Sequence, residues 1–212
     1  MMNKKFLALS TTAVAAALAL AGCSTGTGST ATSSSAAASS SMPGMDHGSS
    51  GMMSSSSPTA STEHNAADTM FTQGMIPHHE QAVEMSEMIL QKKDIPAAVT
   101  DLATRIKAAQ APEIDTMTGW LKSWNESATM SAGHSMDGMM GDDDLKKLDV
   151  TQGTEAAKLF LTQMIAHHEG AVMMAKTETA QGQNADAIKL SKNIVTAQEA
   201  EIQEMKNLLA TL

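Results

Sequence analysis

Apolar residues recur at alternating steps of three and four along four stretches of the chain, which is the spacing of a helix that buries one face. The stripes run from Phe71 to Ile89, from Val99 to Trp124, from Phe160 to Met174 and from Ala187 to Leu212. No stretch shows the strict alternation of a half-buried strand. Helices with one apolar face bury it by packing together, so we predict an all-α four-helix bundle made of two repeated antiparallel helical hairpins.

The second pair of stripes repeats the first. Residues 71–85 and 160–174 are identical at nine of fifteen positions, and both contain Met-Ile followed two residues later by His-His-Glu. The partner stretches share the pattern Gln-x-x-Glu-Ile-x-x-Met at residues 110–117 and 198–205. In an antiparallel hairpin, each pattern lies level with the histidine pair of its own half, because both are a similar number of residues from the turn.

Local signals suggest where the helices begin and bend. Asp94 follows a turn at Lys92 and Lys93 and is predicted to cap the second helix. Pro77 and Pro112 fall inside the predicted helices, where we expect kinks.

The chain begins with a segment that has the character of an export signal, with a basic start, an apolar run and small residues. It ends in Leu-Ala-Gly-Cys, which resembles a bacterial lipobox and implies cleavage before Cys23 and lipidation there; an ordinary secretory signal with an incidental cysteine is the alternative. We therefore expect a lipoprotein signal peptide at 1–22, a disordered tether at 23–64 and a helical domain at 65–212. The domain divides into repeat one at 65–127, a Met/Gly/Asp-rich linker at 128–144 and repeat two at 145–212.

Composition narrows the class of function. Loss of residues 1–22 changes the net charge from −9 to −11, since 12 basic residues remain against 23 acidic ones. An acidic chain without tyrosine and with few other aromatic residues is unsuited to nucleic acid. Cys23 is the only cysteine, which excludes an intramolecular disulfide and a protein thiolate site once it is acylated. The unusual feature is the 19 methionines.

Methionines flank the histidine pairs at helical spacing. Met75 and Met85 share a predicted helix face with His78, and the second copy repeats the arrangement. Neutral imidazole suits several transition metals, and thioether sulfur narrows the choice toward Cu(I). The alternative is that these residues only fill the core. The predicted metal ligands are Met75, His78, His79, Met85, Met164, His167, His168 and Met174.

Other residues are candidates for outer or weaker contacts to the metal. Glu113 and Glu201 stand on core-facing stripes, where a carboxylate is unfavourable unless paired. They could orient the histidines, bind metal directly or lie at the edge of the bundle. Glu80 and Glu169 should point outward. Further candidates are Met117, Met205, Met42, Met45, His47, His134, Met136, Met139 and Met140.

The duplicated pattern Phe-x3-Met-x2-His-His-x2-Ala-x2-Met, together with the two Gln-x2-Glu-Ile-x2-Met segments, resembles the ferritin-like family catalogued as domain of unknown function 305. The resemblance covers residues 68–212 and includes Asp68, an acid common in the family that is replaced by Ala157 in the second copy. It implies a helical extracytoplasmic protein. It also implies copper binding through the eight predicted ligands, because the family includes periplasmic copper-binding proteins.

These observations favour a copper-binding lipoprotein of the bacterial cell envelope that buffers, sequesters or passes on copper, with Cu(I) favoured and Cu(II) the alternative. The expected partners are copper ions, a membrane reached through the lipid on Cys23 and a copper-transfer protein, with no nucleic acid and no catalytic residue. One alternative is a ferritin-like di-metal oxidase, for which carboxylates are few. The other is a helical interaction module that binds no metal.

Overall fold

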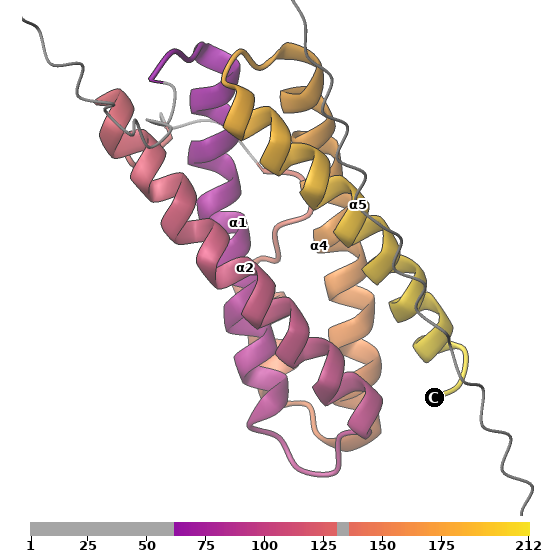
Figure 1. Ribbon diagram of the computed structural model, residues 1–212. Coiled ribbons are helices and arrows are strands. Elements are labelled where there is room, and N and C mark those ends of the chain that lie inside the picture. The colour runs from indigo at the N-terminus through magenta and orange to yellow at the C-terminus, as the bar shows by residue number, and fades with distance from the viewer. Residues whose placement is uncertain (1–61, 131–135) are drawn as a thin grey trace, which may run out of the picture. The chain divides into compact units, whose positions relative to one another are not determined.

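A computed structural model describes residues 62–130 and 136–212, and within these ranges it contains helices and no strand. No helix in these ranges is long and apolar enough to cross a membrane. The predicted signal peptide, the predicted tether up to residue 61 and the candidates Cys23, Met42, Met45, His47 and His134 lie outside the described residues. The helices are α1 (Ala66–Leu90), α2 (Ala97–Trp124), α3 (Asp142–Val150), α4 (Gly153–Gln181) and α5 (Ala185–Leu209) (Figure 1).

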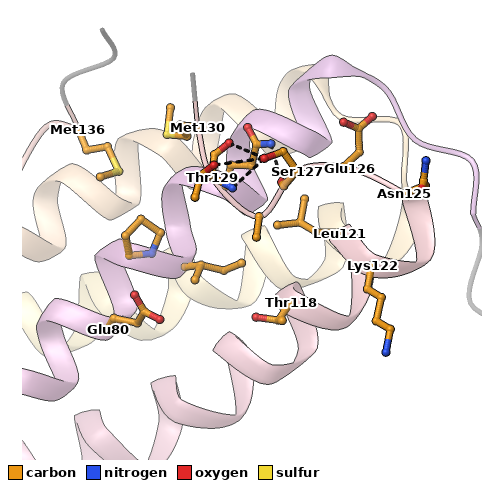
Figure 2. A pocket seen from close by; sticks show the side chains of 14 residues that line it. Glu80, Thr118, Leu121, Lys122, Asn125, Glu126, Ser127, Thr129, Met130 and Met136 are labelled. Atoms are coloured by element: carbon orange, nitrogen blue, oxygen red, sulfur yellow. Dashed lines mark hydrogen bonds between the residues drawn. The ribbon is translucent and has the colours of Figure 1, made fainter. Parts of the chain in front are cut away.

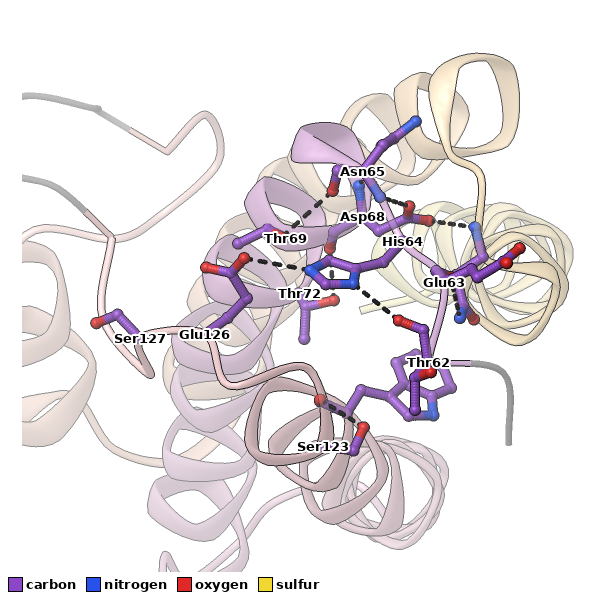
Figure 3. Close-up of polar contacts among 12 residues, drawn as sticks. Thr62, Glu63, His64, Asn65, Asp68, Thr69, Thr72, Ser123, Glu126 and Ser127 are labelled. Atoms are coloured by element: carbon purple, nitrogen blue, oxygen red, sulfur yellow. Dashed lines mark hydrogen bonds and ion pairs between the residues drawn. The ribbon is translucent and has the colours of Figure 1, made fainter. Parts of the chain in front are cut away.

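The start of α1 is stabilised by side chains on both sides of it. Asn65 caps the helix by accepting from the amides of Ala67 and Asp68, and the Asp68 carboxylate accepts from the Asn65 amide in return. Just before the cap, the His64 ring stacks on Trp124 with a centroid distance of 4.6 Å. The same ring bonds to Glu126, which ties the beginning of α1 to the end of α2 (Figure 3).

Each hairpin consists of one helix that carries a histidine pair and one partner helix. In the first, α1 packs along α2; in the second, α4 packs along α5. Ion pairs across the exposed edges, such as Lys107 with Glu87 and Lys176 with Glu199, have an N–O distance of 2.7 Å each and match the antiparallel register. Pro77 and Pro112 both lie inside helices, as expected.

The two hairpins meet along α1 and α4, which run antiparallel at the centre of the bundle, while α2 and α5 lie farther from each other on its flanks (Figure 1). The largest core cluster takes side chains from all five helices, among them Ile89, Ile106, Leu148, Phe160 and Met205. The all-α bundle of two antiparallel hairpins is thus confirmed, with the predicted stripes facing its core.

The turn between α1 and α2 differs from the prediction. Asp94 does not cap α2: it lies in the turn with φ 59°, and the helix begins at Ala97 after Pro96. The proline explains the shift, since the residue before a proline disfavours helical backbone and Pro at the boundary has a fixed φ that suits a helix start.

The segment between the hairpins is more structured than a linker. Its last part forms the short helix α3, which the sequence did not predict and which starts with three aspartates where the helix dipole favours negative charge. Before α3, residues 136–140 cross from α4 to α1, and we call them the strap. At one end Gly138, with φ 86°, lies against the α4 backbone at Gly170. At the other, the Gln81 side chain donates to the Met140 carbonyl at 2.9 Å and accepts from its amide at 2.7 Å.

Candidate metal centre

His78 and His167 meet where α1 crosses α4. Their ring centroids are 3.7 Å apart with an interplanar angle of 43°, and both side chains are buried. The two residues occupy the same position in the two repeats. The approximate twofold axis that relates the hairpins therefore passes between these rings.

His79 and His168 are each held by a carboxylate of the partner helix. The distance from Nε2 of His79 to Oε2 of Glu113 is 2.7 Å, and the distance from Nε2 of His168 to Oε2 of Glu201 is also 2.7 Å. A carboxylate only accepts, so Nε2 carries a proton, and in the neutral form of each ring Nδ1 is the nitrogen with the lone pair. The side chains of Glu113 and Glu201 are 27% and 16% exposed, respectively. They therefore lie at the edge of the bundle and still contact the buried histidines.

The remaining ring nitrogens have no hydrogen-bond partner within the described part of the chain. Both nitrogens of His78 and His167, and Nδ1 of His79 and His168, are fully buried. Buried polar atoms in proteins are nearly always paired, because an unpaired one loses its hydration without compensation. Such a group of buried, unpaired ring nitrogens is typical of a site that binds a metal ion.

The electrostatics keep the central rings neutral. Burial, aided by repulsion from His79 and His168, lowers the pKa of His78 to about 3. Burial and the neighbouring histidines also lower the pKa of His167. The Asp137 carbonyl of the strap opposes the shift at His78, although it forms no hydrogen bond of normal geometry with the ring. Neutral imidazole is the form that binds metals, so both rings stay competent in mild acid.

The central rings are too close to share one ion as they lie. A metal ion about 2.0 Å from one nitrogen of each ring holds the two centroids roughly 5 Å apart at a tetrahedral angle. The observed 3.7 Å is shorter, so one ring has to turn before both His78 and His167 can bind the same ion. Consistently, no three His, Cys, Asp or Glu side chains converge in residues 62–130 and 136–212 in a way that could hold a metal.

The predicted methionine ligands fall into two groups. Met75, Met85 and Met164 are fully buried, as are the weaker candidates Met117 and Met205, and all five belong to the apolar core clusters. Met174 is only partly buried and lines a cavity beside the strap. The strap methionines 136, 139 and 140 are partly buried as well. The ligand set from both repeats stays a prediction, since the structure places its histidines together but leaves the sulfurs dispersed.

Two features of this region were missed by the sequence patterns. Met70, Met130 and Met173 join Met174 around the cavity, although none lies on a predicted stripe. Near them, the buried Glu178 carboxyl faces the carboxylate of Asp68, and burial followed by this contact raises the pKa of Glu178 to about 8. The sequence signal for the acid pair was a difference between the repeats, because Asp68 and Glu178 correspond to apolar Ala157 and Ile89.

Several solved structures are similar to this chain. A DUF305 protein from Streptomyces coelicolor is 36% identical over 68% of this chain and 93% of its own, with a TM-score of 0.65. A DUF305 fragment from Deinococcus radiodurans is 26% identical over 73% of this chain and 100% of its own, with a TM-score of 0.64. CopM in the Cu(I)-bound form is 33% identical over 68% of this chain and 96% of its own, with a TM-score of 0.58.

The sequence comparisons agree with the fold. No curated protein matches the chain. The family model described as Domain of unknown function (DUF305) matches residues 68–209, which is more than half of the chain and includes both histidine pairs and both glutamates that hold them. The chain therefore belongs to the DUF305 family.

Proposed function

We propose that this protein binds copper outside the cytoplasm and buffers, sequesters or passes on the metal. The observation that carries the proposal is the set of buried, unpartnered nitrogens on His78, His79, His167 and His168. Four imidazoles brought together from two repeats are unfavourable as core filling, because six of their ring nitrogens are buried without a hydrogen-bond partner among the described residues. Coordination of a metal by those lone pairs removes the penalty.

Each histidine has a defined part in this site. Glu113 and Glu201 hold the protons of His79 and His168 at Nε2, so these two rings present Nδ1 to the metal. His78 and His167 each have two free nitrogens and can turn toward the ion from the centre of the bundle. The buried thioethers on the same helix faces complete a donor set of nitrogen and sulfur.

The donor set favours copper among the transition metals. Imidazole alone suits zinc, nickel, iron and copper, whereas thioether sulfur selects Cu(I). Met75 and Met164 stand one helical turn before His78 and His167, within reach of the same face. CopM, which is similar to this chain, is described in Cu(I)-bound, Cu(II)-bound and Ag-bound forms, and these are the ions we expect here.

We propose a binding protein rather than an oxidase. A di-metal carboxylate centre in a helical bundle uses about four carboxylates that project into the core. Here Glu113 and Glu201 already hold histidines, and Glu80 and Glu169 are exposed. The other buried carboxylates of the described helices are Asp68 and Glu178, and two are too few for such a centre.

The place of action is proposed from the export signal and from a relative. The Leu-Ala-Gly-Cys motif supports a lipid anchor on Cys23, and the Streptomyces coelicolor relative is provisionally described as a secreted protein. Thioether and imidazole ligands suit an oxidising exterior, where thiolates are lost to oxidation.

The test is a competition titration of the full chain carrying Cys23→Ser, which removes the thiol as a rival ligand. We expect tight Cu(I) uptake, with ¹⁵N resonances of the His79 and His168 rings shifting at Nδ1. Replacing all four histidines of the centre with Gln should abolish this uptake, while His64→Gln, outside the centre, should leave it intact. No Cu(I) uptake by the Cys23→Ser chain would rule the proposal out. Should the fourfold variant unfold, the ring resonances of the parent chain decide the matter.

A further inference from the structure

A small cavity between α1 and α4 is lined by methionine to a degree that core packing does not explain. Its volume is about 250 Å³, and it lies next to the strap. Two of its methionines, Met70 and Met173, are 50% and 53% exposed, which makes them two of the three exposed large hydrophobic residues in the described ranges. The full set of methionines around it is Met70, Met130, Met136, Met173 and Met174.

Three of the sulfurs converge above Gly74. Measured from the point where a Cβ atom of residue 74 would lie, the Sδ atoms of Met130 and Met174 are 3.5 Å away and that of Met136 is 3.8 Å away. Because Gly74 has no side chain, only a hydrogen atom stands between its Cα atom and the three sulfurs. A soft ion bound by the three thioethers has to lie beyond this point, among the sulfurs, because a Cβ position is only about 1.5 Å from the Cα atom. The sulfurs then have to close on the ion to a bond length near 2.3 Å. Methionine side chains have three rotatable bonds, so the sulfurs can make this movement readily.

The second repeat shows that this convergence is not a by-product of the helical pattern. The counterpart of Gly74 is Gln163, whose amide donates to the Asp144 carbonyl at 3.0 Å and fills the space. The counterpart of Met174 is Met85, which is sealed in the core. The same place in the other half therefore holds no free thioether.

The cluster is also reachable from outside. Met130 and Met136 line a second, larger cavity of about 1070 Å³ on the other side of their side chains. Figure 2 shows the two side chains next to each other at the edge of that cavity. No histidine lines the smaller cavity, and its acidic residues are the exposed Asp137 and the buried Glu178 that faces Asp68.

We propose that Met130, Met136 and Met174 form a second site, which binds Cu(I) or Ag(I) through three thioethers, with Met70 and Met173 at its entrance. Its cargo rests on the copper function proposed above, but its ligands are separate from the histidine centre. Thioethers do not titrate and are poor ligands for harder ions, so this site should bind soft monovalent ions equally at pH 5 and pH 7 and should not bind Zn²⁺.

The test follows methyl resonances of [¹³C-methyl]methionine in the full chain carrying Cys23→Ser during titration with Ag(I). We expect the methyls of Met130, Met136 and Met174 to shift together at about one equivalent, at both pH values. Gly74→Ala is the decisive variant, because the added Cβ lies at ordinary contact distance from the sulfurs but fills the space in front of them that the ion requires. It should fold with an unchanged or higher Tm and bind one Ag(I) fewer.

The control is Met88→Leu, which changes a partly buried methionine outside both sites and should leave the titration unchanged. Shifts confined to Met75 and Met164 would support the histidine centre and overturn this second site. Shifts at the three cavity methionines with none at the histidine centre would uphold the second site and count against the first. Full Ag(I) binding by Gly74→Ala would overturn the proposed geometry.

Discussion

Glu113 on α2 holds the ring of His79 on α1 through a hydrogen bond of 2.7 Å between Oε2 and Nε2. The second hairpin repeats this contact between Glu201 and His168 at the same distance. In each half, a carboxylate contacts an otherwise buried imidazole. This contact sets the tautomer of the ring and directs its Nδ1 inward.

Glu113→Gln and Glu201→Gln should each weaken Cu(I) binding by about tenfold, the lower end of the range for residues that orient metal ligands. The amide still accepts a hydrogen bond, so the fold and Tm should change little. The measurement is the Cu(I) dissociation constant by chelator competition. Glu80→Gln makes the same charge change one residue from His79 but on the exposed face. An equal loss in that variant would show that net charge, rather than the hydrogen bond, governs affinity.

Because of the buried Glu178 carboxyl, we expect the free energy of unfolding to fall as pH rises. Its pKa of about 8 in the folded chain lies above its ordinary value of 4.5, so between these values the folded state holds one more proton than the unfolded state. The stabilisation is complete below about pH 4.5 and is lost by pH 8. The pKa of Asp68 shifts in the opposite direction, since the neighbouring Glu178 carboxyl and hydrogen bonds from three backbone amides outweigh burial and lower it. The effect of Asp68 on stability therefore falls below this pH window.

Glu178→Gln should remove that dependence, because an amide resembles the protonated carboxyl. Urea unfolding of the metal-free protein should show the parent chain losing at least about 1 kcal/mol between pH 5 and pH 8.5, the equivalent of one pKa unit. The variant should be flat over the same range. Glu84→Gln, on an exposed position of α1, should follow the parent curve. A parent chain whose stability rises with pH in this window would contradict the buried protonated carboxyl.

Two helix glycines offer a matched pair of substitutions. A Cβ added at Gly170 would lie 2.0 Å from the Asp137 carbonyl oxygen, so Gly170→Ala should push the strap off α4. At Gly119, on the exposed face of α2, nothing lies within 4 Å, and Gly119→Ala should stabilise the protein by about 0.5–1 kcal/mol through helix propensity. Gly170→Ala should instead lower stability and speed amide hydrogen exchange at residues 138–140. Protected amides in that variant would mean that the strap adapts rather than detaches.

The periodic parts of the chain predicted their own structure well. The stripes gave the four long helices, and the duplication supplied two independent views of one register. For that reason the positions of Glu113 and Glu201 along the bundle, relative to the histidines, could be predicted to within one residue. The pairing with His79 and His168, rather than with the stripe residues His78 and His167, depends on helix rotation, which spacing alone does not determine.

The parts that broke the repeat could not be predicted from periodicity. The linker composition indicated a solvated segment, yet Gly138 and Gly170 allow it to lie against α4, and Gln81 fastens it to α1. Such contacts depend on shape at one place in the bundle and leave no periodic signal. The buried acid pair was hidden likewise, because a lone Glu178 on a helix reads as an exposed residue until its neighbours are placed.

The acid pair and the methionine cavity lie at the same end of the α1–α4 interface, and the equivalent end is closed by Ile89, Ala157, Met85 and Gln163. The two halves of the protein are thus alike where their histidines meet, but solvent-exposed thioethers lie at one end of the α1–α4 interface and not at the equivalent end. If copper binds as proposed, the exposed thioethers at this end give the ion access to solvent, whereas the buried residues at the equivalent end give none. Under the proposed function, the protein would receive and release copper at the same end of the bundle.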